Sequence, residues 1–253
     1  MSAFALPSLR MSSKGFRTLT LTQARLLLRA PAALVWLLLP VAMVVLFGCI
    51  PSFGTAQKAL DGKRVIDVYV PTLAAMVPLF LACTALPMTM AGYREKGVLR
   101  RLSVTPVPAA GMLGALLAVM AALTALGVAL IIAIGALAFH VAAPADPGAV
   151  CAAFVLGTTA VLALGLIVAA VARTSGAAGG MGVPLMVLNF FFSGLYVPVA
   201  ELPHVLRRIG EFVPFGAVTA AWSGQGALWG HLAVLAGYTV AGGLVAARLF
   251  RWE

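Results

Sequence analysis

The run of residues 109–139 constrains this chain more than any other feature, because its 31 residues carry no charge. At about 1.5 Å per residue a helix of this length measures about 46 Å, whereas the hydrocarbon layer of a bilayer is about 30 Å thick. Such a helix must tilt in the membrane or project from it. The whole chain is 62% hydrophobic and 9% charged, with a mean hydropathy of +1.08. Soluble domains carry about 25% charged residues, so the sequence predicts an all-α integral membrane protein.

Similar apolar runs recur along the chain and predict six transmembrane helices in a single domain that covers residues 1–253. The predicted spans are residues 32–50, 68–91, 109–139, 149–172, 183–197 and 231–247. Residues 175–182 are rich in Gly, Ala and Ser, and we interpret them as the turn before the fifth span.

The segment before the first span, residues 16–29, has an amphipathic pattern. Thr18, Thr22, Arg25 and Arg29 follow helical spacing on one face, which predicts a helix that lies on the membrane surface. The alternative is that these bases only fix the orientation of the first span. No small-residue cleavage site follows the apolar run, so we expect no removable signal peptide.

The distribution of bases predicts the orientation of the spans. If both termini lie in the cytosol, twelve of the 17 Lys and Arg residues fall on the cytosolic side, as the positive-inside rule requires of a protein in the plasma (inner) membrane. Residues 92–108 then form a cytosolic elbow between the second and third spans. The net charge of +10 therefore reflects membrane topology, and we expect no binding of nucleic acid.

Residues 200–230 are too polar for a span and too apolar for a free loop. Non-helical backbone at membrane depth must be covered by protein or face a water-filled cavity. We therefore predict a re-entrant or interfacial pair of helices on the outer side, between the fifth and sixth spans.

The sequence contains no catalytic or metal-binding constellation. Its three histidines have no acids at ligand spacing, and Ser193 lacks the Gly-x-Ser-x-Gly context of a nucleophile. No phosphate-binding Gly-x-x-x-x-Gly-Lys-Ser/Thr motif is present, so we expect neither enzyme activity nor a cofactor in this chain. Cys49 and Cys151 would both lie at outer span ends, where a disulfide is conceivable, although two unpaired cysteines are favoured.

No Asp, Glu, Lys or Arg falls inside a predicted span, which disfavours an ion-coupled carrier. Four residues of the predicted second and fifth spans are candidates for a substrate pathway or for contacts between helices: Thr84, Asn189, Phe192 and Ser193. Phe192 ends a run of three phenylalanines, which more often faces lipid or the protein core than a ligand. Asn189 is the sharpest of the four. Its amide would either contact a substrate or form an interhelical hydrogen bond worth about 0.6–2 kcal/mol.

Three segments together resemble the permease subunits of type-2 ATP-binding-cassette (ABC) exporters, including their multidrug and daunorubicin-resistance-like branch. The first is Gln23-Ala-Arg-Leu-Leu-Leu-Arg-Ala-Pro before a span that contains Pro40. The second, residues 93–106, reads Tyr-Arg-Glu-Lys-Gly-Val-Leu-Arg-Arg-Leu-Ser-Val-Thr-Pro and is similar to the elbow of the family. The third comprises residues 192–203 and Val213-Pro-Phe, where the family commonly has a polar residue before the proline.

The resemblance implies partners and sites. Two cytosolic ATPase subunits would bind ATP and Mg, and a second permease copy or a paralogue would complete the transporter within membrane lipid. The elbow residues that would couple to the ATPase are Arg94, Glu95, Gly97, Leu99, Arg100, Arg101 and Leu102. The re-entrant region would include Pro198, Glu201, Pro203 and Pro214. The bases at 100 and 101 have an alternative role, since topology and anionic lipid would also explain them.

Two other classes of function are considered beside an exporter of an amphipathic or lipid-like substrate, for which drug, antibiotic, lipid and glycan all stay open. A non-transporting membrane scaffold or assembly factor would use the same surfaces. A membrane-embedded enzyme is disfavoured, because no acid, base and nucleophile occur together.

Overall fold

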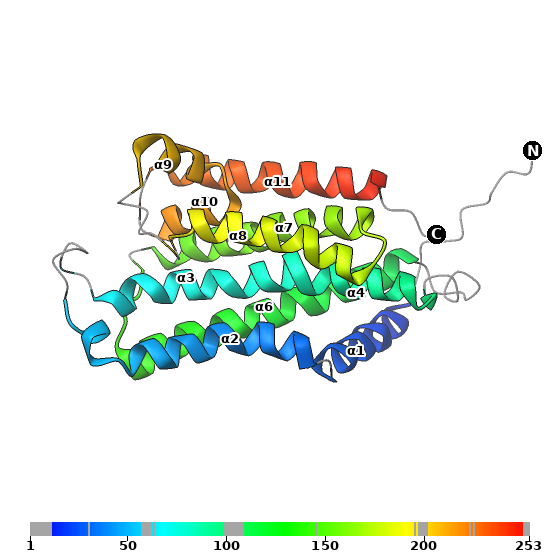
Figure 1. Ribbon diagram of the computed structural model, residues 1–253, viewed down its shortest axis with the longest axis horizontal. Helices are drawn as coiled ribbons and strands as arrows, with labels where there is room; N and C mark the ends of the chain where they lie inside the picture. The colour runs from blue at the N-terminus through cyan, green and yellow to red at the C-terminus, as the bar shows by residue number, and fades with distance from the viewer. Residues whose placement is uncertain are drawn as a thin grey trace, which may run out of the picture.

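The computed structural model describes residues 12–29, 31–56, 62, 64–98, 109–144, 146–194, 196, 202–222, 224 and 226–249, which form a bundle of nearly parallel and antiparallel helices (Figure 1). The helices are α1 (Ser13–Arg29), α2 (Pro31–Gly48), α3 (Val65–Phe80), α4 (Leu86–Glu95), α6 (Ala109–Phe139), α7 (Pro147–Val171), α8 (Ser175–Phe192), α9 (His204–Glu211), α10 (Pro214–Trp222) and α11 (Leu228–Leu249). We call the end of the bundle where α4 finishes the elbow end, and the opposite end the α9 end.

Five helical segments of the described residues are long and apolar enough to cross a membrane. A sixth is added if α1 and Leu34–Gly48, which meet at an angle of 65°, count as one bent span. Together with the near absence of other secondary structure in the described residues, this confirms the all-α integral membrane class.

One helix lies at the centre of the bundle. The segment Val65–Glu95 comprises α3, a π-helical turn and α4, and 83% of its most apolar stretch is buried, against 17% for Leu228–Leu249. We therefore call Val65–Glu95 the central helix.

The two halves of the central helix have different neighbours. α3 packs mainly against α2 and α6, whereas α4 packs against α7 and α8. The π-helical turn marks the change of partners. The largest helix–helix contact elsewhere joins α7 and α11, where the hydroxyls of Thr159 and Thr239 lie 3.1 Å apart.

Most helix bounds agree with the predicted spans to within four residues, and α6 has the predicted bounds. The fifth span differs, because α8 covers Ser175–Phe192 and not residues 183–197. The Gly-rich segment predicted as a turn forms the first two turns of this helix, which the side chain of Thr174 caps. The elbow is also shorter than predicted, because residues 92–95 belong to α4.

Outside the predicted spans, the described residues form short helices and the loops between them. α1 begins at Ser13, three residues before the predicted surface helix, and α9 and α10 form a helical pair in the region predicted as re-entrant. α11 begins at Leu228, inside that predicted region.

Candidate functional site

The middle of the central helix departs from α-helical hydrogen bonding at the π-helical turn Leu81–Ala85. Pro87 has no backbone N–H, so a carbonyl four or five residues before it loses its helical partner. Single π turns inside α-helices accommodate such a change. The buried hydroxyl of Thr84 donates to the carbonyl of Phe80 within the turn.

Two glycines of neighbouring helices approach the carbonyls of this turn. A Cβ atom on Gly165 of α7 would lie 2.0 Å from the oxygen of Ala82, and one on Gly182 of α8 would lie 1.8 Å from the oxygen of Cys83. No side chain fits at these distances, so an α-hydrogen of each glycine points at a carbonyl oxygen, as in a Cα–H···O contact. α7 and α8 therefore pack directly on the π-helical turn.

Arg94, near the end of α4, binds the C-terminal end of α7. One nitrogen of its guanidinium, Nη1, donates to the carbonyl of Ala169 and, over 2.9 Å, to that of Ala172. The last carbonyls of a helix have no partner within the helix and carry a partial negative charge. A cation is the group that this helix end favours.

Glu95, the next residue, binds the N-terminal end of α8. Its carboxylate accepts hydrogen bonds from the backbone N–H of Ser175 over 3.0 Å and from the hydroxyl of the same residue over 2.8 Å. The side chain of Thr174 accepts from the N–H of Ala177, so the two side chains together satisfy donors that a helix start leaves open. An anion is the group that this helix end favours.

Two consecutive residues of opposite charge thus hold the two helix ends that flank the α7–α8 turn. We call Arg94 and Glu95, with their partners Ala169, Ala172 and Ser175, the elbow clamp. The clamp joins α4, α7 and α8 at the elbow end, because the two charged residues of α4 bind the ends of the other two helices. Each charge lies at the helix end whose partial charge is opposite to it. A fourth helix is attached nearby, since the hydroxyl of Tyr93 donates over 2.6 Å to the buried side chain of Gln23 in α1.

The chain turns immediately after the clamp. Gly97 has a φ of +64°, a conformation that glycine adopts without strain. The remaining predicted coupling residues, Leu99, Arg100, Arg101 and Leu102, lie outside the described residues. The structure thus gives Arg94 and Glu95 partners within the chain, which spacing along the sequence did not indicate.

The opposite end of the central helix carries a second charged pair. Arg64 forms an ion pair with Asp67 at 2.6 Å, and its guanidinium also donates to the carbonyls of Phe139 and His140 at the end of α6. The hydrogen bond to the carboxylate raises the pKa of Arg64. Asp67 also accepts from the backbone N–H of Arg64 and so caps α3.

The four predicted pathway or contact residues are all buried inside the bundle. Asn189 donates to the carbonyl of Leu185 over 2.9 Å and accepts from the backbone N–H of Phe215 over 3.4 Å. Its amide therefore joins α8 to the first turn of α10, while a role in a substrate pathway stays a prediction. The hydroxyl of Ser193 donates to the carbonyl of Phe190.

Of the residues predicted for the re-entrant region, Pro203 immediately precedes α9 and Pro214 begins α10. Pro198 and Glu201 lie outside the described residues. Among the described residues no group of three or more His, Cys, Asp or Glu side chains is arranged to hold a metal ion. Cys49 and Cys151 are exposed free thiols.

A family model described as an ABC-2 type transporter matches residues 14–222, which include the central helix, the elbow clamp, α9 and α10. A search of curated proteins found no match to the chain.

Proposed function

Because the chain belongs to the ABC-2 type transporter family, we propose that this transmembrane permease exports an amphipathic or lipid-like substrate across the plasma membrane, driven by a separate ATPase subunit. The chain carries no phosphate-binding motif of its own, so ATP and Mg would bind to that partner. Members of this family form the permease component of an ABC transporter and are not themselves catalytic.

The observation that carries the proposal is the elbow clamp. A movement imposed on the chain after Gly97 reaches Arg94 and Glu95 first, because these residues end the central helix. Through their hydrogen bonds it reaches the ends of α7 and α8 directly. The elbow is thus connected to three helices that cross the membrane.

The proposed coupling divides the elbow into two parts. Leu99, Arg100, Arg101 and Leu102 would contact the ATPase, while Arg94 and Glu95 pass the movement into the bundle. Two ATPase subunits and a second permease copy, or a paralogue, would complete the transporter. Both termini would lie in the cytosol, on the same side as the elbow, in agreement with the distribution of bases.

The substrate class follows from the character of the spans. The described part of the central helix between Val68 and Ala91 contains no ionisable Asp, Glu, Lys or Arg, which fits an amphipathic cargo better than a small ion. Multidrug efflux with antibiotic resistance, as in the daunorubicin-resistance-like branch, is the form we propose first. Lipid and glycan export are the alternatives to be compared in the same assay.

Co-purification and reconstitution test the proposal against a non-transporting scaffold. Tagged full-length protein is extracted in mild detergent, bound partners are identified by mass spectrometry, and the complex is reconstituted into vesicles. We expect an ATPase with phosphate-binding motifs and ATP-dependent movement of at least one member of a panel of amphipathic drugs, phospholipids and glycolipids. Substitution of the motif lysine in the ATPase should abolish that movement.

A charge reversal provides the matched control. Glu95→Lys should reduce ATP-dependent transport at least tenfold, whereas Glu211→Lys, an exposed acid at the α9 end, should leave it within twofold. If the protein retains no ATPase and Glu95→Lys preserves its cellular function, the scaffold alternative replaces the exporter.

A further inference from the structure

The short helix α9 is attached to the bundle along one side only. A Cβ atom on Gly210 would lie 3.1 Å from Cδ1 of Phe192, and one on Gly216 of α10 would lie 2.1 Å from the carbonyl oxygen of Gly210. The preceding residue Leu202 is buried as well. These contacts fix the rotation of α9 about its axis, because a rotation would break the contacts of Gly210 with Phe192 and Gly216.

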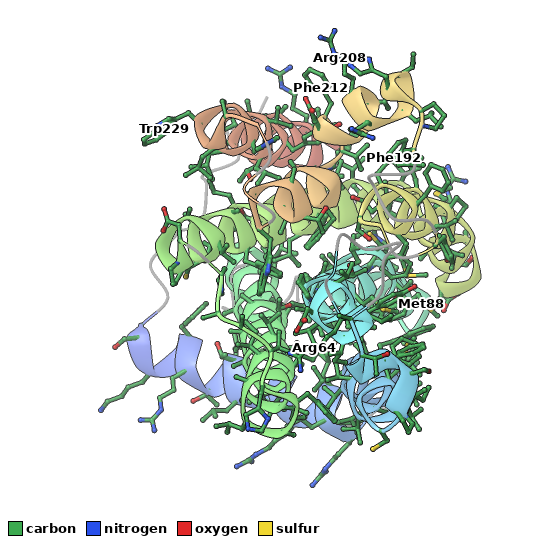
Figure 2. All side chains as sticks on the ribbon, turned by 90° about the vertical axis from the view of Figure 1, so that its left-hand side faces the viewer. Arg64, Met88, Phe192, Arg208, Phe212 and Trp229 are labelled. Carbon is green, nitrogen blue, oxygen red and sulfur yellow. The ribbon has the colours of Figure 1, made fainter. Side chains whose placement is uncertain are left out.

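The side of α9 away from these contacts is apolar and exposed. Val205, Ile209 and Phe212 follow spacings of four and three, so they lie in one row, and their exposed fractions are 69%, 46% and 63%. We call this row the α9 ridge. Figure 2 shows Phe212 pointing away from the bundle.

A polar row lies beside the α9 ridge. His204, Arg208 and Glu211 repeat the same spacing one residue earlier and are exposed. α9 therefore has three sides: one against the bundle, one apolar and one polar. A helix with adjoining apolar and charged sides is typical of the boundary between lipid headgroups and acyl chains.

Two further features indicate that the α9 ridge faces lipid. Trp229, in the first turn of α11 at the same end of the bundle, is 81% exposed (Figure 2), and tryptophan is enriched where membranes meet water. Val187 and Leu188 expose their side chains in the last turns of α8, whose final residue, Phe192, lies against Gly210 of α9. Exposed apolar residues of a span face acyl chains wherever no second subunit covers them, so a lipid-facing surface of α8 would continue towards the ridge.

We propose that the α9 ridge inserts into the headgroup–acyl boundary of the leaflet at the α9 end, with Arg208 at the lipid phosphates. α9 then anchors the end of α8 and the start of α10 to the membrane surface. The proposal requires only that the chain spans a membrane, and it is independent of the ATPase and of the transported substrate.

Spin labels on the full-length chain test this placement. Val205→Cys, Ile209→Cys and Glu211→Cys are labelled singly in a background with Cys49→Ser, Cys83→Ala and Cys151→Ser. Each protein is placed in nanodiscs of phosphatidylethanolamine and phosphatidylglycerol. Collision with oxygen, which concentrates in lipid, is compared with collision with a water-soluble nickel chelate.

At positions 205 and 209 we expect oxygen collisions to exceed nickel collisions at least threefold, and at position 211 the reverse. Val205 is the most exposed of the three ridge residues, so its replacement keeps the test available if Ile209→Cys does not fold. Nickel collisions that dominate at 205 and 209 would place the ridge in water and overturn the proposal. Immobile labels that neither reagent reaches would also overturn it, because a protein surface such as a second copy would then cover the ridge.

Discussion

The two ends of the central helix are built from the same kinds of residue but are connected differently. At the α9 end, Arg64 pairs with Asp67 of its own helix and binds carbonyls at the end of α6. At the elbow end, Arg94 binds carbonyls at the end of α7, and the acid beside it binds the start of a different helix, α8. The charged residues at the α9 end thus bind one neighbouring helix, α6, whereas those at the elbow end bind two, α7 and α8.

This difference agrees with the packing on either side of the π-helical turn. The half that begins at Arg64 packs against α2 and α6, and the half that ends at Glu95 packs against α7 and α8. A force on the elbow therefore acts first on α4, α7 and α8. The part formed by α2, α3 and α6 is the more independent of it, and the following predictions test that contrast.

The largest effect is expected at the close contact that joins α8 to the π-helical turn. Gly182→Ala would place a Cβ atom 1.8 Å from the carbonyl oxygen of Cys83, and a backbone atom in a packed core cannot move aside easily. We expect a loss of about 3 kcal/mol or more, measured as a lower thermal midpoint and less monodisperse protein in detergent.

Gly180→Ala is the matched control, because a Cβ atom there meets nothing within 4 Å. It should leave the thermal midpoint unchanged or slightly raised, since Ala favours a helix over Gly. Equal effects of the two substitutions would mean that α8 does not rest on the turn.

The next largest losses of stability are expected at the two arginines that bind helix ends, Arg94 and Arg64. Arg94→Ala should cost about 2 kcal/mol, because its partners Ala169 and Ala172 are buried and their carbonyls would lose a charged donor. Arg64→Ala should cost about 1 kcal/mol, because His140 is exposed and water can replace the guanidinium there. Unfolding of both variants in the same detergent measures the difference, and a larger loss for Arg64→Ala would reverse the contrast.

The smallest effect on global stability is expected from substitution of the two acids, Glu95 and Asp67. The informative result is which helix shows faster amide hydrogen exchange. Glu95→Gln should speed amide hydrogen exchange in the first turn of α8, a separate helix, because Ser175 loses a charged acceptor. Asp67→Asn should speed exchange at the start of its own helix, α3. Mass-spectrometric exchange on the full-length chain separates the two, and a change confined to α4 in Glu95→Gln would contradict the clamp.

Much of this architecture could be predicted from the sequence. Uncharged runs give the positions of the helices, since a bilayer admits few other solutions, and the apolar but interrupted region after Phe192 predicts the pair α9 and α10. The start of α8 at Ser175 differs from the predicted start at residue 183, because glycine and serine suggest a turn. Thr174, a favourable N-cap three residues before a backbone donor, was the signal that identifies a helix start there.

The connections of the elbow could not be predicted in the same way. Spacing along one helix shows which residues share a face, but it does not show which helix end lies beside Arg94 or Glu95. Their partners are 75 to 80 positions away in the chain. The same limit applies to Asn189, whose contact with α10 depends on the packing of two helices separated by residues of irregular structure.

The most direct test of the account is the distance across the elbow clamp during the ATPase cycle. Nitroxide labels are placed at Lys96, the exposed residue that follows α4, and at Arg173, an exposed residue of the α7–α8 turn. The distance between them is measured by pulsed electron paramagnetic resonance in the assembled complex, with the native cysteines replaced. With the clamp intact we expect one narrow distance that nucleotide does not change, and in Arg94→Ala/Glu95→Ala a broad, nucleotide-dependent distribution. A distance that changes with nucleotide in the unsubstituted clamp, or stays narrow in the double variant, would contradict this expectation.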